Sequence, residues 1–140
     1  MEGRTPAQVY ALVIGAVLVL AGIIGFFYSS AFGSPGKVDG VLGILDVNGW
    51  HNVVHILSGV AGLALMSTAR GARAYALGLA VVYTIVAIWG FAIGDGHSIL
   101  SIVPINTADN VLHALLGLTG LTVYAAGAGT SEAPAAPARA

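Results

Sequence analysis

The sequence predicts an all-α membrane protein, a four-transmembrane-helix bundle built from two parallel helical-hairpin repeats. Of the 140 residues, 57% are hydrophobic and only 8% are charged, whereas charged residues make up about a quarter of an ordinary soluble domain. A bilayer core about 30 Å thick needs about 20 apolar residues per helix, and a helix satisfies its own backbone groups in lipid. The chain contains four such stretches, residues 8–28, 49–67, 74–93 and 108–126.

The first stretch begins like a signal peptide, with Arg4 ahead of it and small residues up to Ala31 at its end. Its apolar region is about 20 residues long, whereas a signal peptide usually has about 7 to 15. We therefore expect residues 8–28 to remain in the protein as its first helix.

The second and fourth stretches each begin near an asparagine, Asn48 and Asn106, a residue type that caps helix N-termini. Both are rich in small side chains, which let helix backbones approach closely in membranes. These residues are Ser58, Gly59, Ala61, Gly62, Gly117, Thr119 and Gly120.

We expect one compact transmembrane domain over residues 1–126, and a disordered cytoplasmic tail over residues 127–140, which are small and contain proline.

The two halves of the chain repeat each other, in units of about residues 7–67 and 74–126. Residues 42–65 align with residues 100–123, and the identical positions include Asn, His and Gly as well as apolar residues. The matched pairs are Leu42 and Leu100, Ile44 and Ile102, Asn48 and Asn106, Asn52 and Asn110, Val53 and Val111, His55 and His113, Leu57 and Leu115, Gly59 and Gly117, Gly62 and Gly120, and Leu63 and Leu121.

The third stretch repeats the first in the same way, since Tyr10 recurs as Tyr75 and Gly25 recurs as Gly90. Each unit contains an even number of spans, so both units have the same orientation in the membrane. A parallel repeat of this kind predicts a pseudo-twofold axis along the membrane normal.

Basic and acidic residues fall in different connections. The basic residues of the N-terminal arm, of the connection between the second and third stretches and of the tail are Arg4, Arg70, Arg73 and Arg139. The acidic residues of the other two connections are Asp39, Asp46, Asp95 and Asp109, accompanied by the single basic residue Lys37. The positive-inside rule therefore predicts a multi-pass protein of the cell membrane with both termini in the cytoplasm.

The histidines form the most specific polar pattern in the chain. His51 and His55 lie one helical turn apart, and the equivalent pair in the second unit is Asp109 and His113. If the second and fourth helices meet at the axis, His55 and His113 lie at the same depth on opposing helices. A histidine at that depth is costly unless it has a partner.

Three hypotheses explain this pattern. In the first, the histidines and the paired asparagines Asn52 and Asn110 are structural hydrogen-bonding groups that tie helices together, and no cofactor is bound. In the second, the set His51, His55, Asp109 and His113 holds a zinc, copper or iron ion. In the third, His55 and His113 alone hold a b-type haem between them.

The segment VNGWHNVVHILSGVAGL, after a helix ending in GIIGFF and before the echo TADNVLHALLGLTGL, resembles the DUF4383 family of small four-helix membrane proteins. The resemblance covers residues 7–126, and its most specific residues are Asn48, His51, Asn52, His55 and Gly59. It implies the four-helix architecture and the importance of this motif. It implies no activity, substrate or cofactor.

Composition excludes several functions. The chain has no cysteine and a net charge of −1, so it offers neither thiolate chemistry nor a basic face for nucleic acid. No nucleophile, base and orienting group come together in the sequence, so we expect no catalysis. The preferred hypothesis is a non-catalytic membrane protein whose partners are the lipid bilayer and other subunits of a membrane complex or a second copy of itself. The alternative is a protein that binds a metal or haem.

Overall fold

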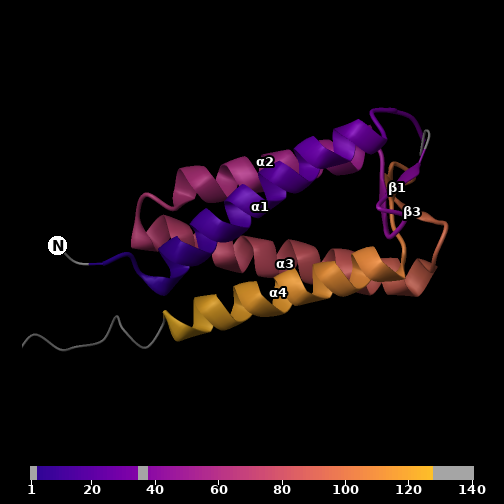
Figure 1. The fold of residues 1–140 in the computed structure, drawn as a ribbon. Coiled ribbons are helices and arrows are strands. Elements are labelled where there is room, and N and C mark those ends of the chain that lie inside the picture. The colour runs from indigo at the N-terminus through magenta and orange to yellow at the C-terminus, as the bar shows by residue number, and fades with distance from the viewer. Residues whose placement is uncertain (1–2, 35–37, 128–140) are drawn as a thin grey trace, which may run out of the picture.

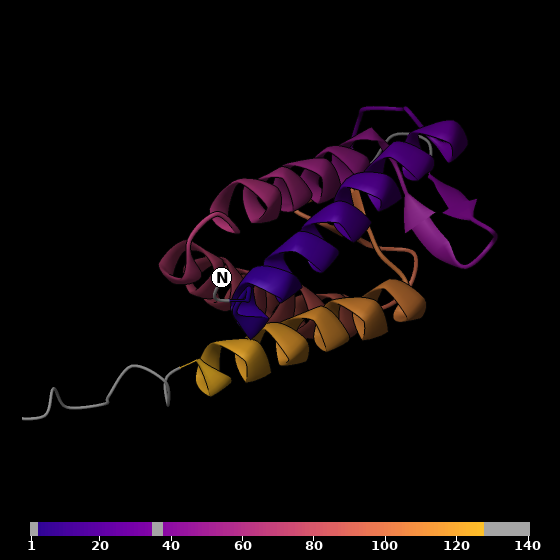
Figure 2. The same cartoon turned by 60° about the vertical axis from the view of Figure 1, so that its left-hand side comes forward.

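The computed structural model describes residues 3–34 and 38–127, which form four helices and two short β-hairpins. Helix α1 (Pro6–Tyr28) packs along α2 (Gly49–Leu65), and α3 (Ala69–Ile93) packs along α4 (Thr107–Ala126). Figures 1 and 2 show the two helix pairs side by side, with the hairpins at one end of the bundle and both ends of the described chain at the other. The all-α fold expected from the sequence is confirmed.

Each helix begins at a capping side chain. Asn48 accepts a hydrogen bond from the backbone N–H of His51, and Asn106 accepts one from the N–H of Asp109. Thr5 and Thr68 cap α1 and α3 in the same way. The prediction that Asn48 and Asn106 lie at helix caps is confirmed.

The third helix begins earlier than predicted, at Ala69 rather than Ala74. Arg70 and Arg73 therefore lie in its first turns, and their assignment to the connection was wrong. Hydropathy along the sequence falls at the arginines, which is why the predicted helix began after them. Arginine is nevertheless a good helix former, and Thr68 caps the helix by accepting a hydrogen bond from the N–H of Gly71.

The segments before α2 and α4 form antiparallel hairpins. Strands β1 (Asp39–Val41) and β2 (Leu45–Val47) pair in the first, and β3 (Ser98–Ile99) and β4 (Val103–Pro104) pair in the second. Two consecutive residues with positive φ turn each hairpin, a geometry that suits the twist of paired strands. They are Leu42 (55°) and Gly43 (70°) in the first, and Leu100 (51°) and Ser101 (60°) in the second.

Small residues line the inside of the bundle and large apolar residues face outward. The buried residues of α1 are Ala7, Ala11, Gly15, Leu18, Gly22 and Gly25. Exposed large side chains occur on every helix, among them Val17, Phe27, Leu57, Val60, Ile85, Ile88, Leu115 and Leu118. The helix backbones consequently come very close together.

Two of the helices, α1 and α3, are long and apolar enough to cross a membrane. The predicted tail lies almost wholly outside the described residues, which end at residue 127.

Candidate metal centre

Three of the four histidines lie together inside the bundle, near its hairpin end. The ring centroid of His51 is 4.5 Å from that of His55 on the same helix and 5.9 Å from that of His113 on α4. The rings of His55 and His113 are 6.3 Å apart. One ring nitrogen from each residue lies within 4.8 Å of the other two.

The protonation of His51 follows from its hydrogen bond. Its Nδ1 lies 2.7 Å from the backbone carbonyl oxygen of Asp46, and a carbonyl oxygen can only accept. Nδ1 therefore carries the proton and Nε2 keeps a free lone pair, the arrangement that orients metal-binding histidines in proteins.

Each of the three rings has an inner nitrogen without a hydrogen-bond partner in the described part of the chain. Nε2 of His51, Nε2 of His55 and Nδ1 of His113 are all buried, and none has a partner among the described residues. His51 is 1% exposed and His113 is 4% exposed, so water has little access to them. Unpaired buried polar atoms are costly, and here three of them come from neighbouring rings.

The nitrogens are close to the spacing that a transition metal needs. With metal–nitrogen distances of about 2.0–2.1 Å, tetrahedral ligand atoms lie about 3.3 Å apart. The observed separations of up to 4.8 Å can be closed by side-chain rotation, because the rings come from only two helices and project into one space. Three imidazoles suit zinc or copper and leave a coordination position open.

Asp109, the fourth ligand considered from the sequence, is engaged elsewhere. Its Oδ2 accepts hydrogen bonds from the backbone N–H groups of Asp46 at 2.9 Å and Asn106 at 3.2 Å. The carboxylate thus completes the cap of α4 and fixes strand β2 to it. It is not part of the group formed by the three histidines.

The arrangement leaves little room for the haem considered from the sequence. A haem ligated by both His55 and His113 would place its macrocycle between their rings. The ring of His51 lies 4.5 Å from one and 5.9 Å from the other, and it fills part of that space.

The capping asparagines also join the two halves of the chain. The side-chain amide of Asn48 donates to the carbonyl of Ile102 at 2.6 Å, and that of Asn106 donates to the carbonyl of Ile44 at 2.8 Å. Each asparagine therefore holds the hairpin of the other half. These bonds fix the helix ends that carry the histidines.

The other two asparagines of the sequence motif pack against glycines of the neighbouring helix. Asn52 donates to the carbonyl of Ser29 at 2.8 Å, and its Oδ1 lies against Gly25. Asn110 lies against Gly90 in the same way. A Cβ at either glycine would collide with the asparagine, so these glycines allow the polar side chains to be buried.

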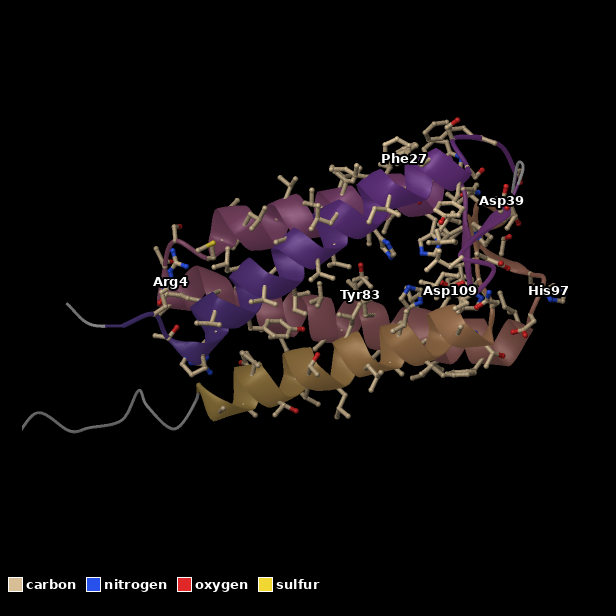
Figure 3. All side chains as sticks on the ribbon, in the orientation of Figure 1. Arg4, Phe27, Asp39, Tyr83, His97 and Asp109 are labelled. Carbon is tan, nitrogen blue, oxygen red and sulfur yellow. The ribbon has the colours of Figure 1, made fainter. Side chains whose placement is uncertain are left out.

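One residue beside the site escaped the sequence analysis. The ring of Tyr83 on α3 is 4% exposed and lies edge-on to His113, with 5.3 Å between centroids. Figure 3 shows Tyr83 directed into the interior of the bundle. Tyr75 and Tyr83 are eight residues apart and so share a face of α3. This spacing in the sequence could have indicated that Tyr83 faces the interior.

Comparison with known proteins identifies the family. The family model described as "Domain of unknown function (DUF4383)" matches residues 8–126, most of the chain. Searches of the curated proteins and of the solved structures returned no match. The chain therefore belongs to the DUF4383 family.

Proposed function

We propose that this chain is a multi-pass integral membrane protein that binds one transition-metal ion through His51, His55 and His113. Two observations carry the metal site: each of the three residues offers a ring nitrogen within 4.8 Å of the other two, and each ring has a buried nitrogen without a partner among the described residues. The membrane location and the metal site rest on separate observations.

The membrane location is supported by the distribution of side-chain size. Leu57 is 63% exposed and Ile88 is 65% exposed, whereas most of the buried residues of α1 and α3 are glycines and alanines. A soluble monomer rarely exposes large continuous apolar surfaces, but membrane helices associate through small residues and turn large ones to lipid. We propose that all four helices span the bilayer, α2 and α4 included.

The distribution of charge supports an orientation. Arg4, Arg70 and Arg73 belong to the end of the bundle where α1 and α3 begin, and the described acidic residues belong to the hairpin end (Figure 3). The positive-inside rule then places both termini in the cytoplasm and the histidines in the outer half of the membrane.

Equivalent contacts support two parallel repeats. The capping asparagines exchange hydrogen bonds between the halves, and both hairpins turn at aligned positions. Tyrosines cross over in the same manner: a Cβ at Gly62 would meet Tyr75, and one at Gly120 would meet the hydroxyl of Tyr10. Such exchange is the contact pattern expected around a pseudo-twofold axis.

A structural role alone is less well supported for the histidines than for three of the four asparagines. Asn48, Asn52 and Asn106 donate their side-chain amides to backbone carbonyls. The inner nitrogens of the histidines have no partner among the described residues, and neither has the amide of Asn110. A metal ion would satisfy all three nitrogens at once. The role as an accessory subunit of a membrane complex stays a prediction, and co-purification of partners after mild solubilisation tests it.

The metal proposal is tested on protein purified in mild detergent, by elemental mass spectrometry and by titration of the chelator-treated protein with Zn²⁺. We expect about one equivalent bound, no haem absorption band, and loss of binding in His51→Ala, His55→Ala and His113→Ala. His97→Ala is the matched control, because His97 is exposed in the second hairpin region and its Nδ1 bonds to the Asp95 carbonyl. A wild-type protein that binds Zn²⁺ no better than His55→Ala would overturn the proposal.

A further inference from the structure

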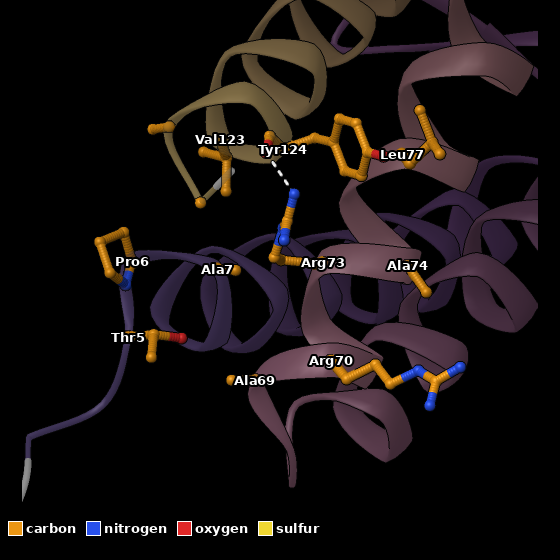
Figure 4. Close-up of a pocket in the computed structure, with 12 residues that line it drawn as sticks. Thr5, Pro6, Ala7, Ala69, Arg70, Arg73, Ala74, Leu77, Val123 and Tyr124 are labelled. Carbon is orange, nitrogen blue, oxygen red and sulfur yellow. Dashed lines mark hydrogen bonds between the residues drawn. The ribbon is translucent and has the colours of Figure 1, made fainter. Parts of the chain in front are cut away.

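A cavity of about 700 Å³ opens at the end of the bundle opposite to the histidines, where α1 and α3 begin and α4 ends. Figure 4 shows it between the first turns of α1 and α3 and the last turn of α4. Its walls are mostly small or apolar, including Pro6, Ala7, Ala74 and Val123, and two arginines lie among them.

Arg73 is the central cation of this cavity. Its guanidinium lies 4.9 Å over the ring of Tyr124, and its Nη2 is 3.4 Å from the carbonyl oxygen of the same residue, a long hydrogen bond. Its Nε is buried without a partner among the described residues. Arg70, which also lines the cavity, is exposed and extends from the rim (Figure 4).

No described acidic residue balances this charge. The described acids, Asp39, Asp46, Asp95 and Asp109, all belong to the hairpin end of the bundle. The cavity therefore combines an arginine with unused hydrogen-bonding capacity, a second arginine at the rim, and apolar walls. This combination suits a phosphate group attached to an apolar body.

We propose that this cavity binds the phosphate-bearing headgroup of an anionic phospholipid. The proposal rests on the membrane location and orientation proposed above, which put this end of the bundle at the level of the cytoplasmic headgroups, and it is independent of the metal site. Arg73 is the main phosphate ligand, since a guanidinium presents paired donors to phosphate oxygens. The alanine, proline and valine side chains face the glycerol and upper acyl carbons.

The test is native mass spectrometry of the detergent-solubilised protein with added phosphatidylglycerol or phosphatidylcholine. We expect the wild type to retain phosphatidylglycerol preferentially, and Arg73→Gln to lower that affinity at least about fivefold. Arg73→Lys keeps the charge but loses the paired donors, so the preference for phosphatidylglycerol should remain at a lower affinity. Arg4→Gln is the matched control, because Arg4 belongs to the same end of the protein but does not line this cavity.

Several results would overturn the proposal. Equal retention of the two lipids would show that the cavity does not recognise their charge. Equal losses of affinity in Arg4→Gln and Arg73→Gln would show that general surface charge, and not this cavity, retains the lipid. Displacement of the lipid by millimolar inorganic phosphate assigns the cavity to a soluble anion. A preference that emerges only in a chain ending at Gly127 assigns the cavity to the chain's own C-terminal residues. Zn²⁺ binding measured on the same samples distinguishes a failure of the lipid proposal from a failure of the metal proposal.

Discussion

Gly59 allows a close approach between helices α1 and α2, and an alanine at this position should force them apart. A Cβ added at Gly59 would lie 2.5 Å from the carbonyl oxygen of Gly15 and 2.6 Å from the backbone nitrogen of Val19. Both atoms belong to the backbone of α1. No side-chain rotation can relieve the collision, so one helix must move away from the other.

The cost follows from the size of that movement. Separations below 3.0 Å are essentially absent for real Cβ atoms, so the helices must part by about 0.5–1 Å, which forfeits a quarter to a half of the contact energy across the gap. Overpacking of this kind costs about 1–3 kcal/mol, and backbone atoms put Gly59→Ala near the top of that range. The better helix propensity of alanine returns about 1 kcal/mol. The expected net loss is about 1–2 kcal/mol.

Thermal unfolding in mild detergent, followed by circular dichroism, measures this loss against two matched glycines. Gly78→Ala should be neutral or stabilising, because a Cβ there meets nothing within 4 Å. Gly117→Ala should be intermediate, because its nearest neighbour is the hydroxyl of Thr84, which can rotate away. If Gly59→Ala unfolds at the same temperature as Gly78→Ala, the described packing of α1 on α2 is incorrect.

Three further predictions concern the polar residues around the metal centre. Asn48→Ala and Asn106→Ala should each lower stability by about 2 kcal/mol, measured by thermal unfolding, since each removes a cap and a bond to the other half; a neutral effect of either would contradict the exchange of bonds. Gly25→Ala should be strongly destabilising in the wild type but tolerated in Asn52→Ala, because its Cβ collides with that asparagine; additive losses in a double-mutant cycle would refute the contact. Asp109→Ala should lower stability yet retain Zn²⁺ binding in the titration, because its carboxylate holds backbone N–H groups; lost Zn²⁺ binding in a folded variant would make it a ligand.

The helices and their caps could be predicted from the sequence because local signals determine them. Apolar length predicted the four helices, and the placement of Asn48 and Asn106 identified the caps of α2 and α4. The start of α3 was misplaced because hydropathy reports polarity, whereas helix formation depends on propensity and capping. Arg70 and Arg73 have high helix propensity, and Thr68 caps the helix.

The histidine cluster could be predicted only in part. The spacing of His51 and His55 places them on one face, and the internal repeat indicated that His113 lies at a similar depth. The same spacing put Asp109 on the face of His113, but two nearby backbone N–H groups bind its carboxylate. Whether Asp109 caps the helix or joins the histidines depends on where strand β2 lies in the fold. Residue spacing along one helix does not show that position.

X-ray absorption at the metal edge of the Zn²⁺-loaded protein tests the metal centre most directly. The proposal predicts a first shell containing three imidazole nitrogens at about 2.0–2.1 Å, and loss of this imidazole signal in His113→Ala, which should no longer bind Zn²⁺. A first shell dominated by oxygen, or a spectrum unchanged in that variant, would contradict a metal centre built from His51, His55 and His113.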